Sequence, residues 1–107
     1  MPRKALENLT ESMFYVLLAL SQRPMCGIEA AAFIERATGG RLQIGPATLY
    51  TILSKFQEVQ YIEEISVEGR KRTYRITARG MDAYHAEVKR LTACLQDAKK
   101  LGGLLHE

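Results

Sequence analysis

The sequence of 107 residues contains no tryptophan, two histidines, two cysteines and three prolines. Cys26 and Cys94 lie far apart and outside any CxxC pattern, which disfavours a disulfide framework and a cysteine-based zinc site. The apolar run Met13–Leu20 is too short to span a bilayer, and no small-x-small cleavage site follows it. We therefore expect a protein of the cytoplasm that has no membrane partner.

The sequence also has few of the features on which enzymes depend. No serine stands in a nucleophile-elbow context, and no glycine-rich phosphate loop is present. We therefore expect neither an enzyme nor a bound cofactor, and we assign no metal ligand. A metal-responsive regulator stays open as an alternative, because the side chains of Cys26, His85, Cys94 and His106 could meet across a dimer.

The residues that are present are those of a globular chain. Hydrophobic residues make up 47% of the sequence and charged residues 25%, and the formal net charge is only +3. A chain of this length forms one small core, so the surface of a partner would add stability. A mild positive charge identifies no partner by itself, and the position of the charges matters more.

The first half of the sequence has a helical period. A first helix is predicted over Leu9–Gln22, after a near capping box of Asn8 and Glu11. A second helix is predicted over residues 28–38, with Ile28 on its apolar stripe and two glycines at its end.

The second half begins with a third helix at Gly45-Pro46, where proline suits the first helical position. The period then changes to that of two strands, Tyr61–Val67 and Lys71–Thr77, before a long helix over Ala78–Leu101. This order predicts a mainly α fold with a small β-hairpin (α+β), namely a winged helix-turn-helix with a long C-terminal dimerisation helix. We expect residues 1–80 to form the DNA-binding unit and residues 81–107 the dimerisation helix.

The last predicted helix carries apolar residues at heptad spacing. These residues are Met81, Tyr84, Val88, Leu91, Leu95 and Ala98. The stripe could pack on its own domain, but so long a helix extends past a small core, which favours pairing with a second copy of the chain.

The third predicted helix has a polar outer face suited to a DNA groove. Its candidate contact residues are Thr48, Tyr50, Thr51, Ser54 and Lys55. Small hydroxyl groups allow close approach to base edges, and a lysine can bind a phosphate or a guanine. On this helix alone, an ordinary solvated face explains the pattern equally well.

The predicted hairpin favours the DNA interpretation. Five basic residues and no acid lie between Gly69 and Met81. They are Arg70, Lys71, Arg72, Arg75 and Arg79. The three at the hairpin tip, Arg70, Lys71 and Arg72, are predicted to contact the DNA backbone. Two alternatives stay open: a charged edge strand that prevents aggregation, and a winged-helix module that binds proteins.

Three segments resemble the PadR-like transcriptional regulators: FYVLLAL…MCGIEAA, IGPATLYTILSKF and EGRKRTYRITARG. The residues that match the pattern of that family are Gly27, Gly45-Pro46, Thr48-Leu49-Tyr50, Gly69-Arg70, Arg72, Tyr74, Thr77 and Gly80. Ile28 stands where many members have tyrosine, and Gln60 stands where glycine is frequent. We expect both departures to lie away from the predicted DNA contacts.

The resemblance implies a homodimer that binds double-stranded DNA and represses transcription at an inverted-repeat operator. It also implies that a small aromatic or hydrophobic molecule sometimes releases the DNA. Such an effector would bind near the dimer interface, against Phe14, Tyr15, Tyr84 and Leu91.

Overall fold

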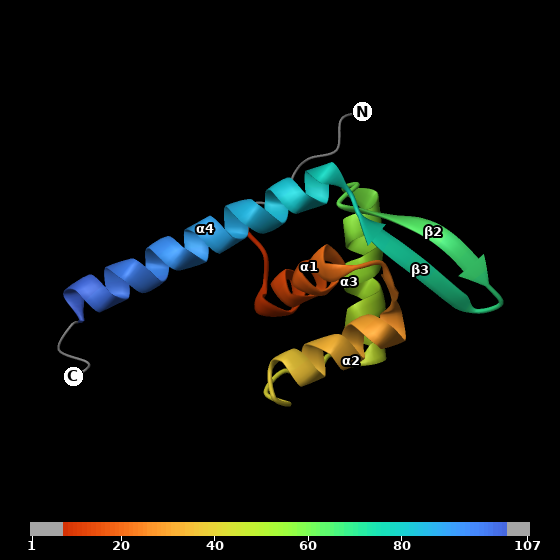
Figure 1. Ribbon diagram of the computed structural model, residues 1–107, viewed down its shortest axis with the longest axis horizontal. Helices are drawn as coiled ribbons and strands as arrows, with labels where there is room; N and C mark the ends of the chain where they lie inside the picture. Colours follow the sequence, from red (N-terminus) through yellow and green to blue (C-terminus); the bar gives the residue numbers. More distant parts are fainter. Residues whose placement is uncertain (1–7, 103–107) are drawn as a thin grey trace.

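The computed structural model describes residues 8–102, which form four helices and one antiparallel sheet of three strands (Figure 1). In chain order the elements are α1 (Glu11–Gln22), β1 (Met25–Cys26), α2 (Gly27–Ala37), α3 (Pro46–Glu58), β2 (Ile62–Glu68), β3 (Lys71–Ile76) and α4 (Ala78–Leu101). The predicted α+β class and the predicted order of helices and hairpin are confirmed. The strand β1 is an addition, because two residues are too few to give a period.

The start of α1 differs from the predicted capping box. The cap is Thr10, whose Oγ1 accepts a hydrogen bond of 3.1 Å from the Met13 amide. Glu11 is then the first helical residue and cannot reach back from the third position, as a capping box led by Asn8 would require. Glu11 still suits its place, because an acidic side chain in the first turn is stabilised by the helix dipole.

The first residues of α2 lie next to the sheet. Met25 pairs with Tyr74 of β3, so that β1 joins the free edge of β3 and the strand order is β1-β3-β2. The helix begins at Gly27, one residue earlier than predicted, and its buried residues are Gly27, Ala30 and Ile34. The prediction that Ile28 faces the core was wrong, since 77% of this residue is exposed.

The core lies where α1, α2 and α3 meet the base of the sheet. Its fully buried large side chains are Val16, Leu17, Met25, Ile34, Leu53 and Phe56. The ring of Phe56 packs 5.8 Å from that of Tyr61, which connects the end of α3 with the start of β2. The apolar side chains of α3 are therefore buried, and its polar face is left on the surface.

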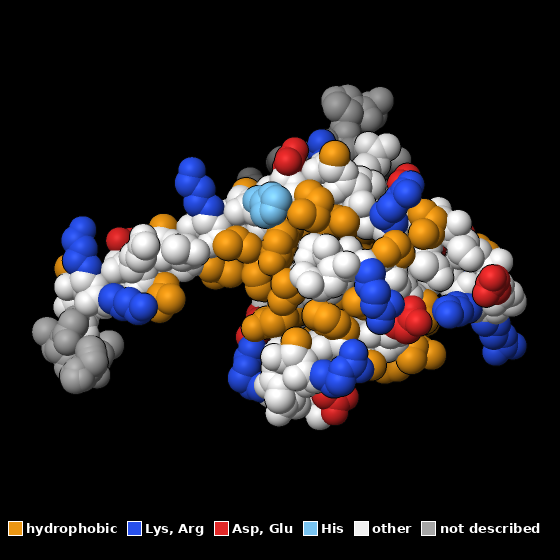
Figure 2. All heavy atoms as spheres, in the orientation of Figure 1, with side chains coloured by type: hydrophobic (Ala, Val, Ile, Leu, Met, Phe, Trp, Pro, Cys, Tyr) orange, Lys and Arg blue, Asp and Glu red, His pale blue; other side chains and the backbone are white. Residues whose placement is uncertain are grey.

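Two elements project from this core in different directions (Figure 1). The hairpin of β2 and β3, which we call the wing (Ile62–Ile76), extends to one side of α3, and α4 extends to the other side. Figure 2 shows hydrophobic side chains gathered where α4 leaves the body, and acidic and basic side chains next to one another at the end of the wing. From Val88 to Leu101 every residue of α4 is exposed.

Candidate nucleic-acid interface

The outer face of α3 is polar and open to solvent. Leu49, Leu53 and Phe56 point into the core. The five predicted contact residues Thr48, Tyr50, Thr51, Ser54 and Lys55 are all exposed. Four of them, Tyr50, Thr51, Ser54 and Lys55, line a shallow depression of about 410 Å³ together with Glu58. The structure therefore brings these residues together on one surface.

Two of these side chains already have partners within α3. The hydroxyl of Thr51 donates to the Ala47 carbonyl at 2.9 Å, which leaves its oxygen available as an acceptor. The Lys55 ammonium lies 3.9 Å from a Glu58 carboxylate oxygen. Both groups are exposed, so water or a ligand can replace Glu58 at low cost.

The first turn of α3 presents unbonded backbone amides. Its cap is Gly45, which has no side chain to accept from them, and Pro46 at the first position has no N–H. The next amides, those of Ala47 and Thr48, therefore point outward at the positive end of the helix dipole. Such an end attracts phosphate groups.

The start of α2 is different, because the side chain of Glu29, a residue of α2 itself, accepts a hydrogen bond from the backbone there. Glu29 Oε1 accepts from the Cys26 amide at 2.9 Å and closes a capping box. This backbone hydrogen bond, helped by the Cys26 side chain, lowers the pKa of Glu29 below its ordinary value of 4.5. A carboxylate at this end opposes the approach of a phosphate.

The basic residues of the wing are less free than the sequence suggests. Arg72 donates to Glu64 at 2.9 Å and Arg75 Nε donates to Glu63 at 3.0 Å, both across the β2–β3 ladder. Lys71 lies 3.9 Å from Glu29. The hydrogen bond to Glu64 also raises the pKa of Arg72. The segment from Gly69 to Met81 contains no acid, but pairing brings the carboxylates of β2 opposite these cations.

Arg70 and Arg79 complete the predicted basic group. Arg70 is exposed in the turn next to Gly69, whose φ of 61° suits glycine, and none of the described acidic residues lies within 4.0 Å of it. Arg79 does not belong to the wing. It stands in the first turn of α4 and donates to the Val59 carbonyl at the end of α3, at 2.8 Å.

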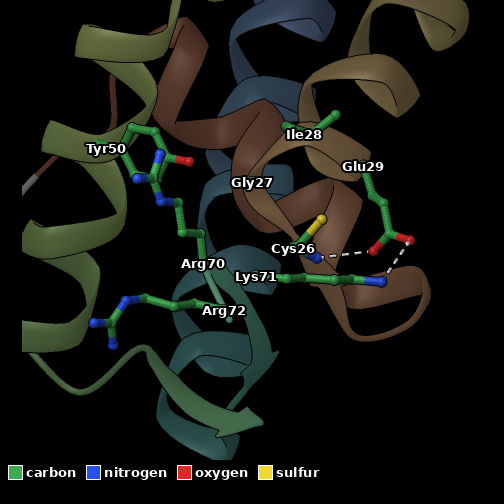
Figure 3. A pocket seen from close by; sticks show the side chains of 8 residues that line it. All are labelled: Cys26, Gly27, Ile28, Glu29, Tyr50, Arg70, Lys71 and Arg72. Carbon is green, nitrogen blue, oxygen red and sulfur yellow. Dashed lines mark hydrogen bonds and ion pairs between the residues drawn. The ribbon is translucent and has the colours of Figure 1, made fainter. Parts of the chain in front are cut away.

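A pocket of about 660 Å³ separates the wing from the helices. It is lined by Cys26, Gly27, Ile28, Glu29, Tyr50, Arg70, Lys71 and Arg72 (Figure 3). The three predicted wing contacts and Tyr50 of α3 therefore share one concave surface. Ile28 lines it too, so the expectation that this residue lies away from the predicted contacts was wrong. The sequence gives no sign that Ile28 is exposed, because an isoleucine at helical spacing predicts a buried side chain.

The predicted effector residues are only partly brought together. Phe14, Tyr15 and Leu91 line a pocket of about 310 Å³ between α1 and α4, but Tyr84 does not. The Tyr84 ring instead stacks on Phe14 with centroids 5.6 Å apart. Sequence reasoning missed Glu87, which also lines this pocket and is only 6% exposed.

Glu87 is held by Arg90 one turn later, whose Nε donates to Oε1 at 3.0 Å. The pair places two opposite charges next to the aromatic rings of α1. A glutamate in the polar stretch of a long helix gives no sign of burial in the sequence, because burial here comes from α1 packing across it.

The heptad residues of α4 divide into two groups. Met81 and Tyr84 are half-buried against the body, whereas Val88, Leu91, Leu95 and Ala98 are exposed. The exposed fraction reaches 56% at Leu95. The apolar stripe therefore continues well beyond the surface that one chain covers.

Two further findings concern the chain over residues 8–102. None of its helices is long and apolar enough to cross a membrane. Within the same range, no three His, Cys, Asp or Glu side chains come together as metal ligands. His106, one of the four residues in the metal-responsive alternative, lies outside the described residues.

Comparison with known proteins gives a match to one protein family and to several solved folds. The profile of the family described as "Transcriptional regulator PadR-like family" matches residues 16–86. A 37.1 kDa Streptomyces fradiae protein in transposon TN4556 is 31% identical over 77 residues, which are 72% of this chain and 22% of that protein. The chain thus spans about a fifth of the length of this curated relative.

Two solved structures illustrate the likeness of the fold. A transcriptional regulator from Clostridium thermocellum, Cth-833, superposes with a TM-score of 0.75 at 22% identity, over 88% of this chain and 98% of that one. Bacillus subtilis PadR, solved in complex with operator DNA, gives a TM-score of 0.65 at 17% identity, over 74% of this chain and 47% of that one. The winged-helix arrangement with a long last helix is confirmed.

Proposed function

Because this chain belongs to the PadR-like family of transcriptional regulators, we propose that it acts as a homodimeric repressor that binds double-stranded DNA at an inverted-repeat operator. One observation carries the proposal. The exposed polar face of α3 and the tip of the wing border a common pocket, with Tyr50 and Arg70 on its two sides. A helix and a hairpin so placed can contact a DNA groove and the adjacent backbone together.

In this proposal α3 enters the major groove. Thr48, Thr51 and Ser54 are short enough to let the helix approach base edges, while Lys55 reaches a phosphate or a guanine. The free amides at the start of α3 hold a phosphate, which fixes the depth and angle of the helix. Tyr50 lies on the flank of α3 that faces the wing.

The wing contributes affinity that does not depend on base sequence. Arg70 offers its full charge to the DNA backbone, whereas Lys71 and Arg72 first exchange Glu29 and Glu64 for phosphates. This exchange between exposed ion pairs is inexpensive. The wing is therefore a moderate and not a strong phosphate clamp.

The second copy of the chain is proposed to pack on α4. Val88, Leu91 and Leu95 expose an apolar stripe of a kind that coiled-coil partners cover. We retain the division into a DNA-binding unit, residues 1–80, and a dimerisation segment, residues 81–107, although residues 1–7 and 103–107 lie outside the described part of the chain. A two-fold axis through paired α4 helices places two α3 helices on half-sites about one helical turn apart.

A small hydrophobic effector is proposed to bind between α1 and α4. The pocket there offers the Phe14 and Tyr15 rings and the Leu91 side chain. Because Tyr84 stacks on Phe14 and does not line the pocket, we expect it to hold the Phe14 ring in place and not to contact the ligand. A thermal-shift screen of aromatic compounds tests this site, and the absence of any stabilised melting transition would contradict it.

The test of DNA binding is a titration of the protein with the DNA upstream of its own gene, over a series of salt concentrations. Lys55→Ala and Arg70→Ala should each reduce the slope of log K against log salt by about one, because each removes one phosphate contact. Tyr50→Ala should weaken specific binding more than non-specific binding. Lys99→Ala, at the far end of α4, is the control for loss of one positive charge.

Two outcomes would reject the proposal. One is a wild-type protein that binds no duplex at low salt. The other is tight binding to a protein partner with no complex on any promoter fragment, which would favour a winged-helix module for protein interaction.

A further inference from the structure

The end of α3 is bonded directly to the start of α4. Three consecutive carbonyls after α3 accept from the first residues of the last helix. The Val59 carbonyl accepts from Arg79 Nε at 2.8 Å, the Gln60 carbonyl from Thr77 Oγ1 at 2.7 Å, and the Tyr61 carbonyl from the Thr77 amide at 2.9 Å. Figure 1 shows this meeting point, where the end of α3 reaches the beginning of α4.

These bonds serve both helices at once. The carbonyls at the end of a helix lack partners within it, and a cation there is favoured by the helix dipole, so Arg79 suits the end of α3 in both respects. Thr77 is also the cap of α4, since its Oγ1 accepts from the Gly80 amide at 3.0 Å. A single threonine therefore belongs to the end of one helix and the start of the other.

Close packing also restricts rotation between the end of α3 and the start of α4. A β-carbon on Gly80 would stand 2.1 Å from the Tyr61 carbonyl oxygen, so the backbone at the start of α4 is in direct contact with the backbone of the segment between α3 and β2. The guanidinium carbon of Arg79 lies 5.8 Å from the centre of the Tyr61 ring. The α3–α4 joint, by which we mean Val59–Tyr61 and Thr77–Gly80, is therefore fixed by hydrogen bonds on one side and by packing on the other.

We propose that Arg79 and Thr77 are positioning residues that fix the angle between α3 and α4, and that this angle sets the half-site spacing the dimer accepts. The inference rests on the proposed function, because it needs α3 on DNA and α4 at the dimer axis. It assigns to Arg79 a role other than the phosphate contact that its place among five basic residues suggests.

Because α4 is long, a small change in the angle between α3 and α4 produces a large displacement of α3 relative to the proposed dimer axis. The 24 residues of α4 span about 36 Å at 1.5 Å per residue. A rotation of about 5° at one end of such a lever displaces the other end by about 3 Å, close to the 3.4 Å rise of one base pair. Because one base pair also turns the half-site by about 34° about the DNA axis, a joint loosened by a few degrees lowers the cost of an altered spacing without removing it.

The experiment starts with selection of the operator by wild-type protein from a library of random-sequence duplexes. Three derivatives are then made: one with a base pair added between the half-sites, one with a base pair removed, and one with a single half-site. Binding of each duplex is measured for wild type, Arg79→Met, Arg79→Lys and the control Arg75→Met. The control removes one arginine from the wing, where Arg75 pairs with Glu63.

We expect Arg79→Met to reduce the preference for native spacing over the altered spacings by at least about fivefold. Its affinity for the single half-site and its salt slope should equal those of wild type, because no phosphate contact is lost. Arg79→Lys should recover part of the preference, since an ammonium group can still donate to the Val59 carbonyl. Arg75→Met should keep the preference of wild type.

An Arg79→Met protein that discriminates between spacings as wild type does would overturn the inference. A salt slope reduced by about one would overturn it as well, because it would place Arg79 on a phosphate. Should Arg79→Met fail to fold, Thr77→Ser and Thr77→Val provide the same comparison with and without the Gln60 bond. A wild-type protein that selects no duplex would refute the proposed function, an outcome that the wild-type arm alone reveals.

Discussion

The carbonyl oxygen of Tyr61 occupies the space that a side chain on Gly80 would need. A β-carbon there would stand 2.1 Å from this oxygen and 2.8 Å from Ile76 Cγ1. Gly27, another buried glycine at the start of a helix, is less constrained, because its β-carbon would meet Leu49 Cδ2 at 3.4 Å. The two glycines belong to the same family pattern but face different steric limits.

Gly80→Ala should therefore lower the free energy of unfolding by about 1–3 kcal/mol, the usual cost of forcing an extra carbon into a packed site. Backbone atoms form the obstacle, so a change of rotamer cannot relieve it. Urea denaturation measures the effect. The control, Gly27→Ala, should change stability by no more than about 1 kcal/mol, because the added methyl makes ordinary contacts and alanine favours the helix. Equal losses in the two variants would contradict this account.

At position 60 a glycine should make the folded protein more stable than the present glutamine does. Its φ is 65°, the left-handed region, and its amide donates to the Gln57 carbonyl just after α3 ends. The following amide, that of Tyr61, donates to Phe56, which completes a Schellman motif. A side chain in this conformation is strained, so Gln60→Gly should raise the free energy of unfolding by about 0.5–1 kcal/mol.

The matched control for Gln60→Gly is Gln57→Gly, three residues earlier. Gln57 is also exposed but lies within α3, where glycine costs about 0.5–1 kcal/mol. The two substitutions should therefore shift the melting temperature in opposite directions. A loss of stability in both variants would show that the conformation of residue 60 carries no strain.

Glu29 should make the stability of the protein depend on pH in the acid range. Its pKa is lowered in the folded state by the hydrogen bond from the Cys26 amide, so the folded protein favours the carboxylate. The stabilisation is complete above the ordinary pKa of 4.5 and is lost as pH falls through the lower folded value. Glu29→Gln should therefore be less stable than wild type at neutral pH, and the difference should shrink as pH falls below about 4.5.

Denaturation with urea at a series of pH values measures this difference. Glu35→Gln removes the same charge from the last turn of α2, where the helix dipole disfavours a carboxylate. It should not reproduce the loss at neutral pH. A gap between wild type and Glu29→Gln that stays constant down to low pH would mean that the capping charge is unimportant.

Glu64 should weaken the binding of DNA by holding Arg72. The two groups lie 2.9 Å apart on the exposed wing. Glu64→Gln should therefore increase affinity for non-specific duplex and steepen its salt dependence by up to about one phosphate contact. Glu68→Gln makes the same change of charge nearer the turn, and no described basic residue lies within 4.0 Å of Glu68. It should have the smaller effect, and equal effects would refute a specific restraint on Arg72.

The elements of this fold were predictable where the local pattern is strong. The spacing of apolar residues predicts the helix α3, and the alternation of apolar and polar residues predicts the strand β3 of the wing. The helix α4 begins and ends where its pattern predicts. The strand β1 was not predictable, because two residues such as Met25 and Cys26 become a strand only through pairing with β3. The cap at Thr10 was missed because Asn8 and Glu11 have the spacing of a different motif.

The candidate site was harder to predict than the fold, because it depends on pairing across elements. The cations of β3 are separated from Glu63 and Glu64 by the turn, and only the register of the hairpin makes them partners. The positions of Ile28 and Arg79 also depend on contacts between elements, which the sequence does not show. Ile28, which was predicted to face the core, lines the pocket beside the candidate interface, and Arg79, which was counted in the basic group that follows Gly69, is bonded to Val59.

The exposed stripe of α4 leads to a prediction about the oligomeric state. Leu95 is 56% exposed in the single chain, so a charge there should leave the fold of one copy intact. Leu95→Lys should raise the dimer dissociation constant by roughly 1000-fold. In the dimer each of two leucines gains about 2 kcal/mol from burial of its side chain, and the substitution removes both contributions. Gln96→Lys introduces the same charge one residue away from the heptad positions and should leave the dissociation constant near that of wild type. Sedimentation equilibrium measures all three proteins, and equal dissociation constants for the two variants would show that the stripe is not the dimer interface.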